Sequence, residues 1–263
     1  MSGEMTSARR SLDKIAGSPI LDEKTLSWVH FVAFCVFSTQ MFLVALAPFP
    51  KKTYTIFVQL LGSEQEFEIS LQRLVVSYFA IVSGHHLIVQ QRIAFEQYLK
   101  GMENECNVFR WSEYSISSSL IIVALGLLCG ISDFRMLFAL FVNMATVILC
   151  GYWAEKETSN WFPHFGGWIL FFHLWGHLLL RYFELLGNRV LDSHLVFLMI
   201  PVMFILFCLF GVVQLLHMFR VGPWRSYLVV ELSYILLSLI TKTTMGFMVL
   251  SRVLHLSRIE KAS

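Results

Sequence analysis

Long apolar stretches separated by short polar segments dominate the pattern of this chain. The hydrocarbon core of a bilayer takes about 20 apolar residues per helix, and seven stretches approach that length. They run from Leu26 to Ala47, Leu71 to Val89, Asn107 to Gly130, Phe134 to Trp153, Phe165 to Leu186, His194 to Phe219 and Ser226 to Leu250. The pattern predicts an all-α membrane protein, a seven-transmembrane helix bundle that forms a single domain over residues 1–263 with a polar N-terminal tail at residues 1–24.

The connection between the first two predicted helices, residues 48–70, is longer than the others. It contains a β-prone run from Thr53 to Leu60, the turn dipeptide Gly62-Ser63, and a second extended run from Glu64 to Ile69. Two such runs around a turn favour a short β-hairpin, and an irregular loop is the alternative.

Composition narrows the class of protein further. The chain is 56% hydrophobic and only 14% charged, whereas soluble domains carry about 25% charged residues. A soluble enzyme and a disordered chain are therefore excluded, and no enzymatic activity is expected. A net charge of +2 gives no basic field for nucleic acid, so the expected partner is the lipid bilayer. The five cysteines form no CxxC pair, which argues against a disulfide framework and a zinc site.

The distribution of lysine and arginine gives a weak indication of how the chain is oriented in the membrane. An odd number of helices places the termini on opposite sides of the membrane. Lysine and arginine divide almost evenly between the two sides, with a slight excess on the N-terminal side. The positive-inside rule therefore favours a cytoplasmic N-terminus and an extracellular C-terminus.

One lysine, Lys242, lies inside the seventh apolar stretch. About ten residues, or about 15 Å of helix, separate it from the nearer helix end, and a lysine at that depth costs about 2.5–3.5 kcal/mol on insertion scales. It is either a structural lysine paired with a carboxylate or an amine that forms a Schiff base in a dry pocket.

Two carboxylates are candidate partners for this lysine. Glu113 lies early in the third stretch, as a helix-end carboxylate or as a buried counter-ion. Side chains lean toward the N-terminus of their helix, and the third and seventh helices start on the same side, so Lys242 can point toward Glu113. Glu231 precedes Lys242 by eleven residues on nearly the same face as Ser238, and we interpret it as an interfacial anchor in preference to a polar track.

The other polar and aromatic candidates have simpler interpretations. His173 and His177 have a spacing that suits metal ligands, but no cysteine or carboxylate completes a set, so no metal is expected. Phe207 and Phe210 share a helix face, as core packing or as a slot for an apolar chromophore.

Two segments resemble the heliorhodopsin family. The first is the serine-rich run Arg-Trp-Ser-Glu-Tyr-Ser-Ile-Ser-Ser-Ser from Arg110 to Ser119, followed by Leu128 to Asp133. The second runs from Tyr227 to Lys242 and includes Glu231 and Ser238. The resemblance is strong over residues 107–156 and 210–242 and weak in the first and fifth helices.

The resemblance implies a light-absorbing photoreceptor with all-trans retinal bound to Lys242 as a protonated Schiff base and Glu113 as counter-ion. The Schiff-base neighbours and polar cavity would comprise Ser238, Ser117, His86, Glu231 and Tyr114. The retinal pocket would include Phe207, Phe210, Ser118 and Met144. The resemblance also implies that the hairpin packs on the partner in a homodimer, and that light is signalled through conformation or a partner of unspecified kind.

Departures from the family pattern leave alternatives open. The family has a histidine near the first-helix Gln-Met pair, whereas here Phe37, Ser38 and Thr39 precede Gln40, and His30 lies two turns before Phe37. The fifth helix carries the polar residues His173, His177, Arg181 and Glu184. Glu184 and the histidines among these groups, together with Glu231, motivate a light-gated or light-driven proton conductor as the alternative function. The third-helix proton donor of outward pumps is absent, since Ala124 stands at its place. A seven-helix receptor or transporter without retinal is the remaining alternative.

Overall fold

A computed structural model describes residues 23–47, 54–60, 63–187 and 194–262. Most of the predicted polar tail, together with parts of the 48–70 loop, lies outside these residues. The described elements are α2 (Glu23–Leu46), β1 (Tyr54–Leu60), β2 (Ser63–Ile69), α3 (Leu71–Val89), α4 (Arg92–Glu103), α5 (Val108–Leu128), α6 (Phe134–Lys156), α7 (Phe162–Gly187), α8 (His194–Met218), the 3-10 turn η1 (Gly222–Arg225) and α9 (Tyr227–Ala262).

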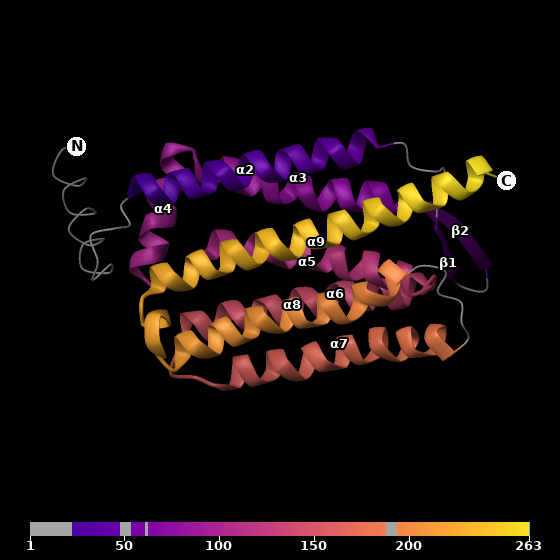
Figure 1. The fold of residues 1–263 in the computed structure, drawn as a ribbon. Helices are drawn as coiled ribbons and strands as arrows, with labels where there is room; N and C mark the ends of the chain where they lie inside the picture. Colours follow the sequence, from indigo (N-terminus) through magenta and orange to yellow (C-terminus); the bar gives the residue numbers. More distant parts are fainter. Residues whose placement is uncertain (1–22, 48–53, 61–62, 188–193, 263) are drawn as a thin grey trace.

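Within the described residues, seven long helices lie side by side, so the predicted bundle is confirmed (Figure 1). α2 packs on α3, α3 on α5, and each later helix packs on the next until α9 returns to α2. Six of these helices, all except α3, are long and apolar enough to cross a membrane. α3 carries Gln72, Arg73 and two adjacent histidines, which lower its hydropathy, yet it packs between α2 and α5 in the same bundle.

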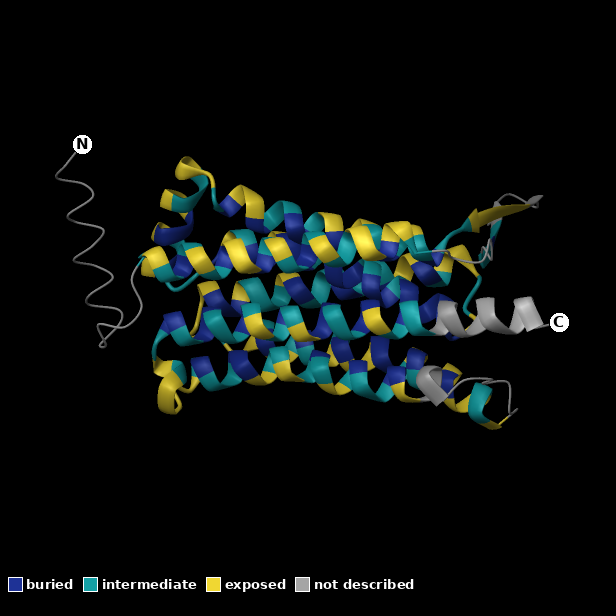
Figure 2. Ribbon diagram, turned by 45° about the horizontal axis from the view of Figure 1, so that its top comes forward, coloured by how far each residue is buried: buried dark blue, intermediate teal, exposed yellow. Residues whose placement is uncertain are grey.

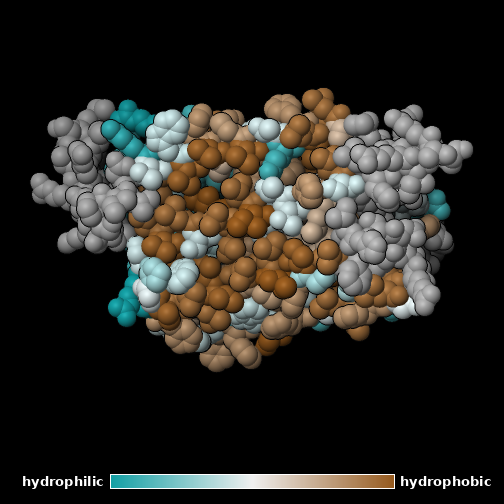
Figure 3. All heavy atoms as spheres, viewed as in Figure 1, coloured by the Kyte–Doolittle hydropathy of each residue, from teal (hydrophilic) through white to brown (hydrophobic). Residues whose placement is uncertain are grey.

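Each helix has one buried face and one exposed face. Buried residues face the interior of the bundle and exposed residues lie on its outer faces (Figure 2). The side of the molecule seen in Figure 3 is largely hydrophobic between its two ends. Exposed side chains such as Phe42, Leu149 and Phe247 are therefore on the surface that faces lipid, because apolar surface is stable in a bilayer.

The predicted hairpin is also confirmed. β1 pairs antiparallel with β2, with Tyr54 opposite Ile69 and Leu60 opposite Ser63. The Phe57 N–H donates to the Ser132 carbonyl at 2.9 Å, which ties the hairpin to the loop between α5 and α6. We call this end of the bundle the hairpin end and the opposite end, where α4 and η1 lie, the α4 end (Figure 1).

Two elements differ from the sequence prediction. The segment after α3 forms α4, a helix whose apolar face is buried through Tyr98, Leu99 and Met102; it is too short to register as a membrane stretch. α9 continues to Ala262, beyond the expected end at Leu250. Its last residues are good helix formers, and a helix that extends past the apolar stretch does not have to be apolar.

Candidate functional site

Lys242 and Glu113 meet in the interior of the bundle. The Lys242 Nζ donates to Glu113 Oε1 at 2.8 Å, and each side chain is 3% exposed. α9 supplies the lysine at mid-helix and α5 supplies the glutamate about one and a half turns from its start. Both side chains lean toward the α4 end. A charged pair at this depth is stable only as a pair, because either charge alone would lose its hydration without compensation.

Hydroxyl and aromatic groups surround this pair. The Lys242 Nζ lies 4.8 Å from the ring centre of Tyr114. Ser238 lies one turn before Lys242, and Ser117 one turn after Glu113. The buried hydroxyls of Ser117, Ser238 and Thr241 have no hydrogen-bond partner among the described residues. Buried hydroxyls are normally paired, so these atoms are available to a bound group or to ordered water.

A pocket extends away from Lys242 between α5, α6, α7, α8 and α9. Its lining includes all four residues expected in a chromophore pocket, Phe207, Phe210, Ser118 and Met144, together with Tyr114. The pocket thus has a reactive amine at one end and mostly apolar walls, which is the arrangement that a long apolar aldehyde needs.

Two glycines keep the pocket narrow and aromatic. A Cβ placed on Gly211 would lie 2.5 Å from the Trp168 ring, and one on Gly151 would lie 2.6 Å from the Trp111 ring. Each tryptophan ring can therefore approach the backbone of a neighbouring helix closely. Such closely walled slots suit flat, elongated ligands, so the residues present fit a retinal.

Three histidines meet on the other side of the pair. The Nδ1 atoms of His30 and His86 are 2.8 Å apart, so one ring must donate and the other accept. The ligand atoms of His30, His85 and His86 all lie within 4.8 Å of one another, close enough to hold a metal ion. His85, the other of the two adjacent histidines of α3, also approaches this group: its ring centre lies 6.3 Å from that of His30.

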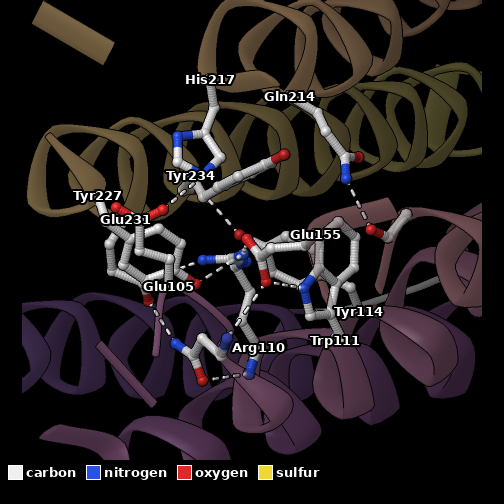
Figure 4. Close-up of polar contacts among 12 residues, drawn as sticks. Glu105, Arg110, Trp111, Tyr114, Glu155, Gln214, His217, Tyr227, Glu231 and Tyr234 are labelled. Atoms are coloured by element: carbon white, nitrogen blue, oxygen red, sulfur yellow. Dashed lines mark hydrogen bonds and ion pairs between the residues drawn. The ribbon is translucent and has the colours of Figure 1, made fainter. Parts of the chain in front are cut away.

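A buried ion cluster, drawn in Figure 4, lies nearer the α4 end, because Arg110 is two residues after the start of α5 and Glu155 one residue before the end of α6. Arg110 forms ion pairs with both Glu155 and Glu231, and all three side chains are 2–3% exposed. The Asn107 amide donates to Glu231 at 2.6 Å, and Trp111 donates to Glu155. The Arg110 guanidinium also lies 4.2 Å from the ring centre of Tyr234, which lines the pocket.

The cluster corrects the interpretation of Glu231 as an interfacial anchor. Glu231 is 1% exposed because Arg110, on the facing helix, neutralises it. The Tyr98 phenol of α4 also donates to it at 3.4 Å, and burial, aided by the negative charge of Glu231, holds the pKa of Tyr98 well above its usual value. Sequence reasoning missed Glu155 and Asn107; the only signal was a carboxylate in the last turn of the fourth helix.

The polar residues of the fifth helix lie outside the bundle. His173, His177, Arg181 and Glu184 are exposed on α7. Asn143 of α6 bonds to His173 at 2.9 Å, and Arg181 pairs with Glu184 at 2.7 Å. These groups therefore lie on the outer surface of the bundle, away from the buried Lys242, and whether they contribute to proton conduction stays a prediction.

Comparison with known families agrees with this arrangement. The sequence profile of the heliorhodopsin family matches residues 23–254, which is most of the chain. The chain belongs to the heliorhodopsin family. It is therefore a multi-pass membrane protein of the microbial-rhodopsin-like class, whose members carry a retinal chromophore. No curated protein matches the chain.

Proposed function

We propose that this heliorhodopsin is a photoreceptor that binds all-trans retinal as a protonated Schiff base on Lys242, with Glu113 as the counter-ion. The observation that carries the proposal is the buried 2.8 Å pair between these residues at the end of an aromatic pocket. No other lysine of the described residues lies in a buried position.

The residues have distinct tasks in this proposal. Retinal supplies the absorption of light and the isomerisation. Glu113 stabilises positive charge at the Lys242 nitrogen, and Phe207 and Tyr114 restrict the shape of the slot. The unpartnered hydroxyls of Ser117 and Ser238 are placed to accept or donate a hydrogen bond when the Lys242 N–H changes direction.

Reconstitution with all-trans retinal tests the proposal. The wild type should develop a visible band that hydroxylamine removes, and Lys242→Ala should develop none. Lys100→Ala, which removes an exposed lysine of α4, is the matched control and should retain the band. A normal band in Lys242→Ala without added amine would contradict the proposal.

Proton conduction is the alternative function, and it has weaker support. The α7 polar groups that motivated it face outward, which leaves the histidines near Lys242 as its structural basis. Electrical recording under illumination separates the two functions: a photocurrent that depends on the proton gradient favours the conductor, and its absence at all voltages favours the sensor.

We also propose a homodimer with the N-terminus in the cytoplasm and the C-terminus outside. Phe67 of the hairpin is 52% exposed, and His173 and Asn143 form a polar group on the outer face of α6 and α7. Polar side chains facing lipid are costly, and a second copy that covers them removes this cost. Cross-linking in native membranes and protease accessibility of the two termini test assembly and orientation.

A further inference from the structure

A groove with a volume of about 810 Å³ lies between α3, α4 and α5. Its lining includes Gln97, Ser112 and Ile116, which are exposed, so the groove opens on the outside of the bundle. Glu113 also lines it. The groove therefore leads from the surface of the protein to the carboxylate that holds Lys242.

The groove and the chromophore pocket lie on different faces of α5. On this helix the pocket is lined by Trp111, Tyr114, Ser118 and Ile121, and the groove by Phe109, Ser112, Glu113 and Ile116. Spacings of three and four residues place each set on its own face of the helix. Among the described residues, the two linings have no member in common.

The Lys242–Glu113 pair lies where these two spaces approach each other. Lys242 lines the pocket and Glu113 lines the groove. The hydrogen bond of 2.8 Å between Lys242 Nζ and Glu113 Oε1 joins the two linings. The ion pair is therefore part of the partition between the pocket and the outer groove.

Polar groups mark a short way from the mouth of the groove to Glu113. Glu113 lies five residues after the start of α5, or about 7.5 Å of helix, and so is close to the α4 end. Gln97 and Ser112 are exposed, and the half-buried His85 contributes to the wall from α3. An ordered water needs about two to four polar partners, and these side chains supply them along the groove.

We propose that the groove is the route by which water and small water-soluble molecules reach the Lys242–Glu113 pair from the α4 end, and that the pair separates this route from the chromophore pocket. While the pair is closed, Glu113 is accessible from the groove and the pocket stays dry. When the Lys242 N–H turns away from Glu113, the partition opens and groove water reaches the nitrogen. This light-dependent part of the inference rests on the proposed linkage of the chromophore to Lys242.

Carboxylate labelling tests the route without requiring pigment. The full-length protein, with or without retinal, is treated with a water-soluble carbodiimide and an amine, and labelling is quantified by peptide mass spectrometry. Gly84→Leu should fill the groove, since Gly84 lines it and a Cβ there meets open space. The variant should reduce labelling of Glu113 several-fold and leave labelling of Glu96, whose side chain is 61% exposed, unchanged.

Hydroxylamine bleaching tests the partition in the pigment. The wild type should bleach faster in light than in the dark, and Gly84→Leu should bleach several-fold more slowly than the wild type in light. Ile116→Trp fills the same groove from α5 and replaces Gly84→Leu if that variant does not fold. Gly176→Leu, with open space around its Cβ, and Ile205→Trp, at a residue that is 58% exposed, lie outside the groove and should keep the wild-type rates.

The outcomes separate this inference from the proposed function. If no pigment forms with all-trans retinal, the proposed function fails, and labelling of Glu113 decides whether the groove is a water route. If pigment forms but the groove-filling variants bleach and label as the wild type does, water reaches the pair by another way; the inference is then overturned and the proposed function stands. Absence of Glu113 labelling in the wild type would overturn the inference as well.

Discussion

The buried cation Arg110 offers the most direct test of how the α4 end is held together. We consider Arg110→Met, which keeps an unbranched side chain but removes the positive charge. The variant leaves Glu155 and Glu231, each 2% exposed in its side chain, without their shared partner. Asn107 and Trp111 still donate to them, but no charge balances the two carboxylates.

The expected cost follows from the two ion pairs. At an effective dielectric constant of about 20, two unit charges about 3 Å apart attract by about 5.5 kcal/mol, so the two pairs together amount to about 11 kcal/mol before desolvation. The variant also removes the desolvation penalty of the guanidinium itself. Breaking one buried pair costs about 3–5 kcal/mol net, and we expect about 5 kcal/mol here because two carboxylates lose their partner.

Thermal unfolding in detergent, followed by far-UV circular dichroism, measures this cost. For a chain of this size 1 kcal/mol corresponds to about 2–4 °C in Tm, so Arg110→Met should unfold about 10–20 °C below the wild type. Arg92→Met is the matched control: its ion pair with Glu96 is exposed, and exposed pairs contribute at most about 1 kcal/mol.

A compensated variant separates charge from packing. Arg110→Met combined with Glu155→Gln and Glu231→Gln removes all three charges and should recover most of the lost Tm. If Arg110→Met unfolds within a few degrees of Arg92→Met, the cluster does not stabilise the bundle by charge. If the triple variant is as unstable as Arg110→Met, the loss arises from packing and the electrostatic argument is refuted.

Three further predictions use other parts of the molecule. Glu113→Gln should shift the visible band to longer wavelength and lower the pKa of the Schiff base, because the positive nitrogen loses its anion. When the pH is raised, the variant should therefore lose the visible band at a lower pH than the wild type does; an unchanged spectrum over a pH titration would assign the counter-ion elsewhere. Gly211→Ala should reduce pigment yield severalfold, since its Cβ would lie 2.5 Å from Trp168, whereas Gly176→Ala, with open space around it, should not; equal yields would show that the tryptophan can move. Burial, reinforced by the charge of Glu155, raises the pKa of Cys106 to about 11, so its alkylation rate should keep increasing from pH 9 to 11, and a plateau by pH 9.5, measured by peptide mass spectrometry, would contradict this.

Much of the fold was predictable because the membrane requires long apolar segments. Helix positions, the hairpin and the unusual position of Lys242 all follow from residue type along the chain. The lean of helical side chains toward the N-terminus of their helix allowed Lys242 to point toward Glu113, and the two side chains lie 2.8 Å apart. α4 was missed because a short amphipathic helix leaves no membrane-length signal.

Partners between distant helices were harder to predict. Glu231 looks like an interfacial residue in sequence because nothing nearby in the chain neutralises it, and its partner Arg110 is 121 positions away. The α7 polar residues were hard to place for a different reason. The spacing of polar residues along a helix does not tell which face of that helix meets the bundle. His30, displaced from the family pattern, reaches His86 only through the packing of α2 on α3.

The sequence by itself determined that this protein is a helical membrane bundle with one lysine at mid-depth, because the cost of placing charge in hydrocarbon leaves few other interpretations of such a pattern. Tertiary structure alone decided which charges neutralise one another and which side chains line the chromophore pocket. Those contacts depend on the rotation of each helix about its axis, and that rotation is fixed by packing between helices.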